Sequence, residues 1–172
     1  MILKDNPLNT GERIRTFSGE YLSVFEPTPE EIHIEDIAHA LSNQSRFAGQ
    51  CKRHFSVAEH CIYISKFVPD HLKFEALMHD ASEAYLVDMP SPIKSLFPQY
   101  KEIENLLMGV IAKKYNFSWP VHPLVKEADH IGLVYEWKNN VLTDNFKNDR
   151  PLTPKQAKKK FLELFEEYQK LR

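Results

Sequence analysis

Three predicted helices each carry a polar side chain on the stripe that should face the core. His60 lies three residues after Val57 and four before Ile64, so it shares their helix face. A buried imidazole needs hydrogen-bond partners. Taken alone, His60 is more typical of a core histidine bonded to a backbone carbonyl, but the positions of two aspartates favour a metal ligand.

Those two aspartates show the same conflict between polarity and position. Asp80 follows Leu77 by three residues, and Asp129 follows Val125 by four, so each carboxylate falls on an apolar stripe. Desolvating an unpaired carboxylate costs several kcal/mol, so a buried aspartate needs either a hydrogen bond from a neighbouring helix or a cation beside it. Two of them, with His79 beside Asp80, are difficult to satisfy without a metal ion.

The combined set supplies two imidazoles and two carboxylates but no thiolate. Closed structural zinc sites usually recruit cysteine, whereas imidazole and carboxylate ligands suit Mn²⁺, Co²⁺, Fe²⁺, Zn²⁺ or Mg²⁺ in a site that keeps positions for water and substrate. A lone His-Asp dipeptide is a weak signal, and the four-residue constellation is a much stronger one. We therefore expect one divalent ion bound by His60, His79, Asp80 and Asp129.

Three further side chains could complete a hydrolytic site around that ion. Glu83 lies three residues after Asp80 on the same predicted helix, where its carboxylate could accept a proton from water. Asp88 lies in the following loop and could share the acid and base work or bind a sugar hydroxyl. The planar fork of Arg46 matches two phosphate oxygens. Each of the three, taken alone, is also typical of a surface residue.

Six predicted helices must bring these residues together. Apolar residues recur at helical spacing, and Ser56 with Glu59 three residues later is a capping box that marks a helix start. Helices are expected over residues 28–43, from Ser56 to Pro69, from Asp70 to the prolines at 90 and 92, and over 99–115, 123–140 and 153–171. A short hairpin is expected within 16–24 and a loop over 42–54. Few glycines and short connections favour an all-α orthogonal bundle.

The last predicted helix carries an apolar and a basic face. Its apolar residues could form an interface, but completing the core is the safer interpretation; they are Phe161, Leu164, Phe165, Tyr168 and Leu171. Lysines at 155, 158, 159 and 160 are followed by acidic residues, a pattern typical of a solvated helix face.

The composition is that of one folded domain. With 172 residues, 42% of them apolar, and a net charge of −2, the chain can bury a core, which excludes disordered, collagen-like and mucin-like classes. No apolar run approaches the roughly 20 residues of a membrane helix, and no signal peptide is evident, so we expect a single cytoplasmic domain over 1–172 with no membrane partner. The near-zero charge argues against a nucleic-acid partner. Cys51 and Cys61 are expected to be reduced thiols.

The order of the proposed ligands resembles a known signature. His60, the His79-Asp80 pair and Asp129 follow the H…HD…D pattern of the HD-domain phosphohydrolase superfamily, whose fold is helical. The runs 77–85 (LMHDASEAY) and 88–94 (DMPSPIK) are similar to the bacterial HD-domain 5′-deoxynucleotidases. The resemblance extends over roughly residues 34–140.

A second part of the resemblance lies upstream of the first histidine. The segment Ser45-Arg46-Phe47 resembles an Arg-Trp pair that contacts substrate in those enzymes, with Phe47 in place of the tryptophan. The spacing from Arg46 to His60 is one residue shorter than in the family. The base and sugar contacts could therefore differ here.

The resemblance implies a metal-dependent enzyme that hydrolyses deoxynucleoside monophosphates to nucleoside and phosphate. It implies Glu83 and Asp88 as catalytic acid–base residues, one divalent ion as cofactor, and a homo-oligomer that is a dimer or larger. The substrate-binding residues that it implies are Arg46, Phe47, His60, Asp80, Asp88, Met89, Pro90 and Ser91.

Three other functions stay open at this point. A small deoxynucleoside triphosphate triphosphohydrolase would use the same ion and water and would release tripolyphosphate. A non-catalytic nucleotide-binding or interaction module would keep the fold and the ion, although such modules usually lose a ligand or the base. A purely structural site would bind the ion without turnover. Lys94 and Arg53 are weaker candidates for phosphate contacts than Arg46.

Overall fold

The fold is all-α, as predicted, with a short hairpin at its N-terminal edge. The computed structural model describes residues 13–143 and 151–172. Strands β1 (Arg13–Arg15) and β2 (Tyr21–Ser23) pair antiparallel, which confirms the hairpin. The α-helices of the described residues are α1 (Ile34–Asn43), α2 (Val57–Ile64), α3 (Lys73–Met78), α4 (Glu83–Leu86), α5 (Ser91–Lys94), α6 (Pro98–Tyr115), α7 (Pro123–Glu136) and α8 (Pro154–Gln169).

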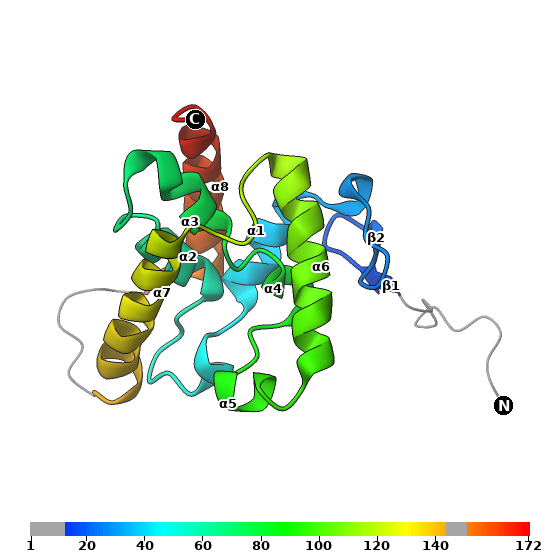
Figure 1. The fold of residues 1–172 in the computed structure, drawn as a ribbon. Coiled ribbons are helices and arrows are strands. Elements are labelled where there is room, and N and C mark those ends of the chain that lie inside the picture. Colours follow the sequence, from blue (N-terminus) through cyan, green and yellow to red (C-terminus); the bar gives the residue numbers. More distant parts are fainter. Residues whose placement is uncertain (1–12, 144–150) are drawn as a thin grey trace, which may run out of the picture.

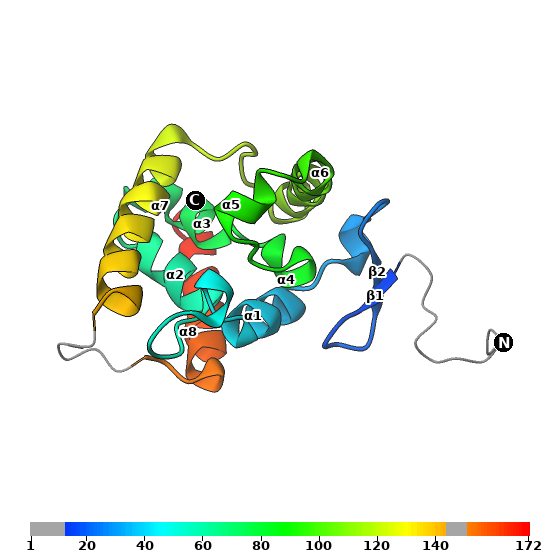
Figure 2. The same cartoon turned by 90° about the horizontal axis from the view of Figure 1, so that it is seen from below.

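The helices form a central group flanked by two long ones. Figures 1 and 2 show α7 and α6 on opposite sides of α1 to α4, with the hairpin projecting on the side away from α7. Helix α8 packs against α1, α2 and α3. Its residues Phe161, Leu164, Phe165 and Tyr168 are buried in the core, as predicted. The prediction is wrong for Leu171, which lies beyond the end of α8 and is 46% exposed. Burying one such aromatic side chain stabilises the fold by about 1.5–3 kcal/mol.

The capping box predicted at the start of α2 is present. The Ser56 hydroxyl accepts a hydrogen bond from the Glu59 amide at 3.1 Å, and Glu59 Oε2 accepts one from the Ser56 amide at 2.9 Å. The second oxygen of Glu59 accepts from the Leu152 amide at 2.8 Å. The cap that begins α2 therefore also anchors the chain just before α8.

Two predicted helix boundaries are wrong. The helix expected from residue 28 begins at Ile34 instead, because residues 29–31 form a separate 3₁₀ turn. The helix expected to run on from Asp70 breaks after Met78. The His79 imidazole Nδ1 lies 2.7 Å from the Ala76 carbonyl oxygen. In a continuous helix, this oxygen would instead accept a hydrogen bond from the backbone amide four residues later. The chain then continues through tighter i→i+3 turns into α4.

Two other helices end earlier than predicted. Helix α2 stops at Ile64, and the helix expected over 123–140 is α-helical only to Glu136, after which Trp137–Val141 form a π-helical turn. A π-turn widens the helix by one residue and often marks a functional region. Both cysteines are free thiols, as predicted.

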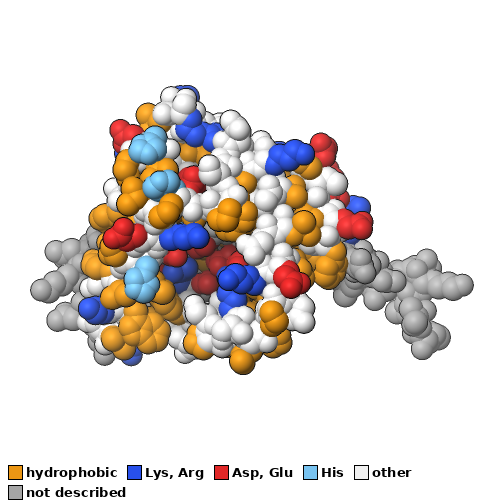
Figure 3. All heavy atoms as spheres, in the orientation of Figure 1, with side chains coloured by type: hydrophobic (Ala, Val, Ile, Leu, Met, Phe, Trp, Pro, Cys, Tyr) orange, Lys and Arg blue, Asp and Glu red, His pale blue; other side chains and the backbone are white. Residues whose placement is uncertain are grey.

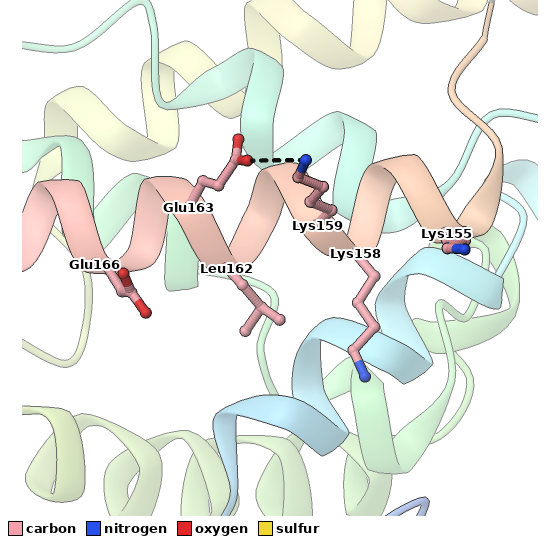
Figure 4. A pocket seen from close by; sticks show the side chains of 6 residues that line it. All are labelled: Lys155, Lys158, Lys159, Leu162, Glu163 and Glu166. Carbon is pink, nitrogen blue, oxygen red and sulfur yellow. Dashed lines mark ion pairs between the residues drawn. The ribbon is translucent and has the colours of Figure 1, made fainter.

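The lysine-rich face of α8 is a surface of mixed charge. A hollow of about 380 Å³ lies on this face, and Figure 4 shows the lysine and glutamate side chains that line it along the helix. Lys159 lies 3.8 Å from Glu163, and Lys158 lies 3.1 Å from Glu35 of α1. These pairings agree with the solvated face that the sequence predicts. None of the helices in the described ranges combines the length and apolar character needed to cross a membrane.

Candidate metal centre

The predicted ligands lie close together in the structure. Figure 3 shows a hollow between α7 and α6, with acidic side chains in its depth and lysine or arginine side chains at its rim. Helix α2 supplies His60, the turn after α3 supplies His79 and Asp80, and α7 supplies Asp129. Three separate segments thus bring the four predicted ligands together.

The four ligand atoms are spaced as if around one ion. His60 Nε2 lies 3.2 Å from His79 Nε2, 3.1 Å from Asp129 Oδ1 and 3.5 Å from Asp80 Oδ2. His79 Nε2 lies 3.3 Å from Asp80 Oδ2 and 3.7 Å from Asp129 Oδ1. Ligands bound at about 2.0–2.2 Å from a common ion lie roughly 3 Å or slightly more from one another. The observed spacing fits such a site.

The other ring nitrogens of the two histidines set the direction of their lone pairs. His60 Nδ1 lies 2.7 Å from Glu136 Oε1, and His79 Nδ1 lies 2.7 Å from the Ala76 carbonyl oxygen. Carboxylate and carbonyl oxygens only accept, so both Nδ1 atoms donate and both Nε2 lone pairs face the cluster. Two lone pairs and two carboxylates repel one another unless a cation lies between them. The donor set therefore fits a divalent ion.

Protons can occupy the cluster when no ion does. Burial lowers the pKa of His79, but the charge of Asp80 and the hydrogen bond with Asp129 outweigh it and raise this pKa well above its ordinary value. Burial raises the pKa of Asp80, yet the neighbouring His79 brings it down to about 2. The pKa of Asp129 is also lowered by its hydrogen bonds to both imidazoles, which exceed the effect of burial. A metal ion would displace the proton from the His79 imidazole.

Asp129 is more exposed than predicted. Its side chain is 42% exposed, whereas those of His60 and His79 are buried. The buried stripe of α7 consists of Val125, Ala128, Gly132 and Glu136, so Asp129 lies at the border of this stripe. Its carboxylate is therefore the most solvent-exposed of the four predicted ligands.

Gly132 lies where α7 contacts α2. A Cβ at this position would meet Ile64 Cδ1 of α2 at 2.2 Å. Gly132 therefore permits the close approach of α7 to α2. That approach brings Asp129 within 3.1 Å of His60.

Glu136 is a site residue that the sequence analysis missed. It is only 1% exposed, and its carboxylate accepts hydrogen bonds from His60 Nδ1 at 2.7 Å and from Arg46 Nη2 at 3.2 Å. Carboxylates that hold the second nitrogen of a ligand histidine orient the ring and raise its basicity. The signal for Glu136 is its position seven residues, or two helical turns, after Asp129.

Arg46 lies in the site, among carboxylates. Besides its bond to Glu136, its Nη1 lies 3.7 Å from Asp80 and 3.9 Å from Asp88. The side chain is buried, and its Nε has no hydrogen-bond partner among the described residues. Burial lowers the pKa of Arg46, but Glu136, Asp80 and Asp88 together raise it. Arg46 is thus a permanent cation next to the proposed ion.

Both predicted acid–base residues are in or next to the cluster. Burial, together with the charges of Asp80 and Asp88, raises the pKa of Glu83 well above its usual value. Glu83 Oε2 is buried and has no hydrogen-bond partner in the described part of the chain. Burial raises the pKa of Asp88, and Arg46 offsets this only in part. Lys94, a weaker candidate by sequence, lies 3.8 Å from Glu83 and 2.5 Å from Glu104.

Gln44 is a second residue without a sequence signal. Its amide nitrogen donates to the Glu83 carbonyl at 2.8 Å, and its amide oxygen accepts from the Asp88 backbone at 3.1 Å. One side chain thus ties both ends of the segment that carries the two acid–base candidates. Between them Val87 has a φ of 75°, which is strained for a β-branched residue.

The remaining predicted substrate contacts surround this segment. Phe47 follows Arg46 and is half-buried, Met89 and Pro90 are half-buried, and Ser91 is exposed at the start of α5. Their roles toward substrate stay predictions.

Two relatives in bacteria match this chain. YfdR of Escherichia coli strain K12, whose name describes it as uncharacterized, is 39% identical over 172 residues that cover 92% of this chain and 97% of YfdR. The chain belongs to the YfdR family. RCAP_rcc00048 of Rhodobacter capsulatus, also described as uncharacterized, is 31% identical over 131 residues. These residues cover 68% of the present chain and 67% of RCAP_rcc00048. No family model matches the chain.

Proposed function

We propose that this protein is a divalent-metal-dependent phosphohydrolase of nucleotides and that deoxynucleoside monophosphates are its best substrates. The observation that carries the proposal is the convergence of the Nε2 atoms of His60 and His79, which lie 3.2 Å apart, with two carboxylates. One oxygen of Asp80 and one of Asp129 each lie 3.1–3.7 Å from both nitrogens. The resemblance of residues 77–94 to HD-domain 5′-deoxynucleotidases supports the choice of substrate.

Each step of phosphate ester hydrolysis has a candidate side chain near the proposed ion. A bound divalent ion supplies the charge that lowers the pKa of water and polarises a phosphoryl oxygen. Glu83 accepts the proton of the attacking water, because its raised pKa brings its basicity closer to neutral pH. Arg46 binds the phosphoryl oxygens through its planar fork. Asp88 protonates the leaving oxygen or holds the sugar hydroxyl.

Arg46 can bind phosphate while it keeps its bond to Glu136. Its Nη2 is bonded to Glu136 at 3.2 Å, and its Nη1 lies 3.7–3.9 Å from the carboxylates of Asp80 and Asp88. The two longer contacts exceed hydrogen-bond length and leave Nη1 available to a substrate oxygen. The shorter bond to Glu136 holds the rigid guanidinium in place while Nη1 donates to the phosphate.

Metal removal and replacement test the proposal. The protein is stripped with EDTA, supplied with Mn²⁺, Co²⁺ or Mg²⁺, and assayed for phosphate release from each ribo- and deoxyribonucleotide. We expect turnover only with added metal, and none for His79→Ala or Asp80→Ala proteins that remain folded by circular dichroism. Wild-type turnover in either variant after chelation and metal addition would refute the metal site. Tight metal binding without any turnover would indicate a structural or non-catalytic role.

Arg46 provides a separate test of phosphate recognition. A charge-assisted hydrogen bond is worth about 1.5–3 kcal/mol, so Arg46→Ala should lower kcat/KM more than tenfold. Arg15→Ala, which removes an exposed arginine in the hairpin, is the matched control and should leave kcat/KM unchanged. An unchanged kcat/KM for Arg46→Ala would mean that Arg46 has only a structural role.

A second candidate function is the hydrolysis of deoxynucleoside triphosphates to tripolyphosphate. The observation that favours it is Lys94, a second cation 3.8 Å from Glu83, since a longer phosphate chain carries more charge. Phosphorus NMR of the products separates the two activities, because one releases orthophosphate and the other tripolyphosphate. The predicted homo-oligomer is tested in the same preparations by light scattering.

A further inference from the structure

An aromatic pair lies beside Arg46, and of its two rings only Phe47 is among the substrate contacts that the resemblance implies. The ring centroid of Phe47 lies 5.4 Å from the Arg46 guanidinium carbon. The Trp137 ring lies 5.5 Å from the Phe47 ring in an edge-to-face arrangement. Trp137 directly follows Glu136, whose carboxylate bonds both Arg46 and His60. The pair therefore adjoins the position at which Arg46 would hold a phosphate.

The pair leaves aromatic surface in water. Trp137 is 45% exposed, and Phe47 is half-buried. Exposed aromatic surface next to a charged site is typical of ligand binding. Tyr135, two residues earlier on α7, differs because its ring stacks on Tyr63 at 5.5 Å and belongs to another face of the helix.

The backbone is strained at Phe47, and its loop is hydrogen-bonded to the segment that carries Trp137. Phe47 and Ala48 have φ values of 55° and 52°, which non-glycine residues rarely adopt. The loop is anchored to the end of α7, where the Lys52 amide donates to the Asn140 carbonyl at 2.9 Å, and the two segments lie side by side in Figure 1. Trp137 begins the π-helical turn. Strained backbone and π-turns concentrate at functional sites.

We propose that Phe47 and Trp137 form a stacking site for the nucleobase of the substrate, while Arg46 binds its phosphate. This inference rests on the proposed function and specifies how the substrate is recognised. Every base presents a π-face, so stacking selects for the presence of a base and tolerates its identity. The larger purine rings stack over more area than pyrimidines and bind more tightly.

Substrates with and without a base test the stacking site. Deoxyguanosine monophosphate and 2-deoxyribose 5-phosphate are compared with Mn²⁺ on the wild type and on Trp137→Ala. We expect the KM for the nucleotide to rise at least fivefold, the lower limit of base–aromatic stacking, while the KM for the sugar phosphate is unchanged. Trp137→Phe should restore most of the affinity. Tyr135→Ala, the matched control on the same helix, should change neither KM.

Other outcomes overturn the inference. An equal change for both substrates would mean that Trp137 only supports Arg46. No change for either would mean that the rings do not bind the base. A changed oligomeric state of Trp137→Ala in light scattering, with an unchanged ratio of the two KM values, would assign the exposed ring to a contact between copies of the chain.

A binding measurement separates this inference from the proposed function. The chain has two tryptophans, so Trp119→Phe leaves Trp137 as the sole indole fluorophore. Deoxyguanosine, which has no phosphate ester, should quench its fluorescence. Quenching without turnover in the wild type would support the base site and refute the phosphohydrolase. Turnover without quenching, and without the KM effect, would refute the base site alone.

Discussion

Replacing Glu136 with glutamine tests whether this buried carboxylate tunes the metal site. Glu136 is 1% exposed and accepts hydrogen bonds from His60 at 2.7 Å and from Arg46 at 3.2 Å. Glutamine has nearly the same shape, but its amide offers one accepting oxygen and one donating nitrogen. One of the two bonds can therefore persist, and the other becomes a contact between two donors.

The expected cost follows from that single lost bond. A hydrogen bond to a charged group contributes about 1.5–3 kcal/mol, and loss of a carboxylate behind a ligand histidine typically weakens metal binding by about 10- to 100-fold. We therefore expect the Kd of Glu136→Gln for Mn²⁺ or Co²⁺ to rise by about this factor. The affinity falls because the His60 ring loses both its fixed orientation and the basicity that Glu136 confers.

Chelator competition measures this affinity, and thermal unfolding of the metal-free protein checks the fold. Glu127→Gln is the matched control, since Glu127 is an exposed glutamate on the same helix. A folded Glu136→Gln protein whose metal Kd stays within about threefold of the wild type, well below the expected range, would refute the role of Glu136. An equal loss in Glu127→Gln would show that the helix charge, and not the contact with His60, matters.

Three further predictions concern packing, protons and capping. Gly132→Ala places a Cβ 2.2 Å from Ile64 Cδ1, so overpacking should lower the free energy of unfolding by about 1–3 kcal/mol and weaken metal binding. Denaturant titration with and without Mn²⁺ measures both effects. An unchanged free energy of unfolding would mean that Ile64 moves aside freely. Because the pKa of His79 is raised in the metal-free protein, protons compete with the metal, and apparent affinity should increase as pH rises from about 6 to 8. Calorimetry in buffers of different ionisation enthalpy should show proton release on binding, and an affinity independent of pH would contradict the cluster. Ser56→Ala removes the hydroxyl that caps α2 by accepting a hydrogen bond from the Glu59 amide. The free energy of unfolding in urea should fall by about 1 kcal/mol. A fall below a few tenths of a kcal/mol would mean that the cap does not stabilise the fold.

Local sequence patterns were sufficient to identify the four predicted ligands. Helical periodicity placed His60 and Asp80 on apolar faces, and a charged or polar group there has few explanations other than a partner or an ion. The capping box at Ser56 set the start of α2, because its two reciprocal bonds span only three residues. These features depend on neighbours along one helix, so a sequence can show them.

Contacts across the fold decided the rest of the site. Glu136 bonds His60 across 76 residues of sequence, and Trp137 meets Phe47 across a similar distance. No periodicity within one helix encodes such a pairing. The break of the helix at His79 likewise comes from a side chain taking a carbonyl from the backbone, which propensity does not predict.

The sequence by itself indicated that His60 and Asp80 face the interior and that their residue types suit a metal ion, but it missed the buried Glu136 and predicted Asp129 to be more buried than it is. The tertiary structure decided which of them meet, because the separation of α2 and α7 depends on packing at Gly132. Hydrophobic burial fixes that separation without regard to direction, while ligands and hydrogen bonds require distances accurate to a few tenths of an ångström. Only the packed helices supply that accuracy.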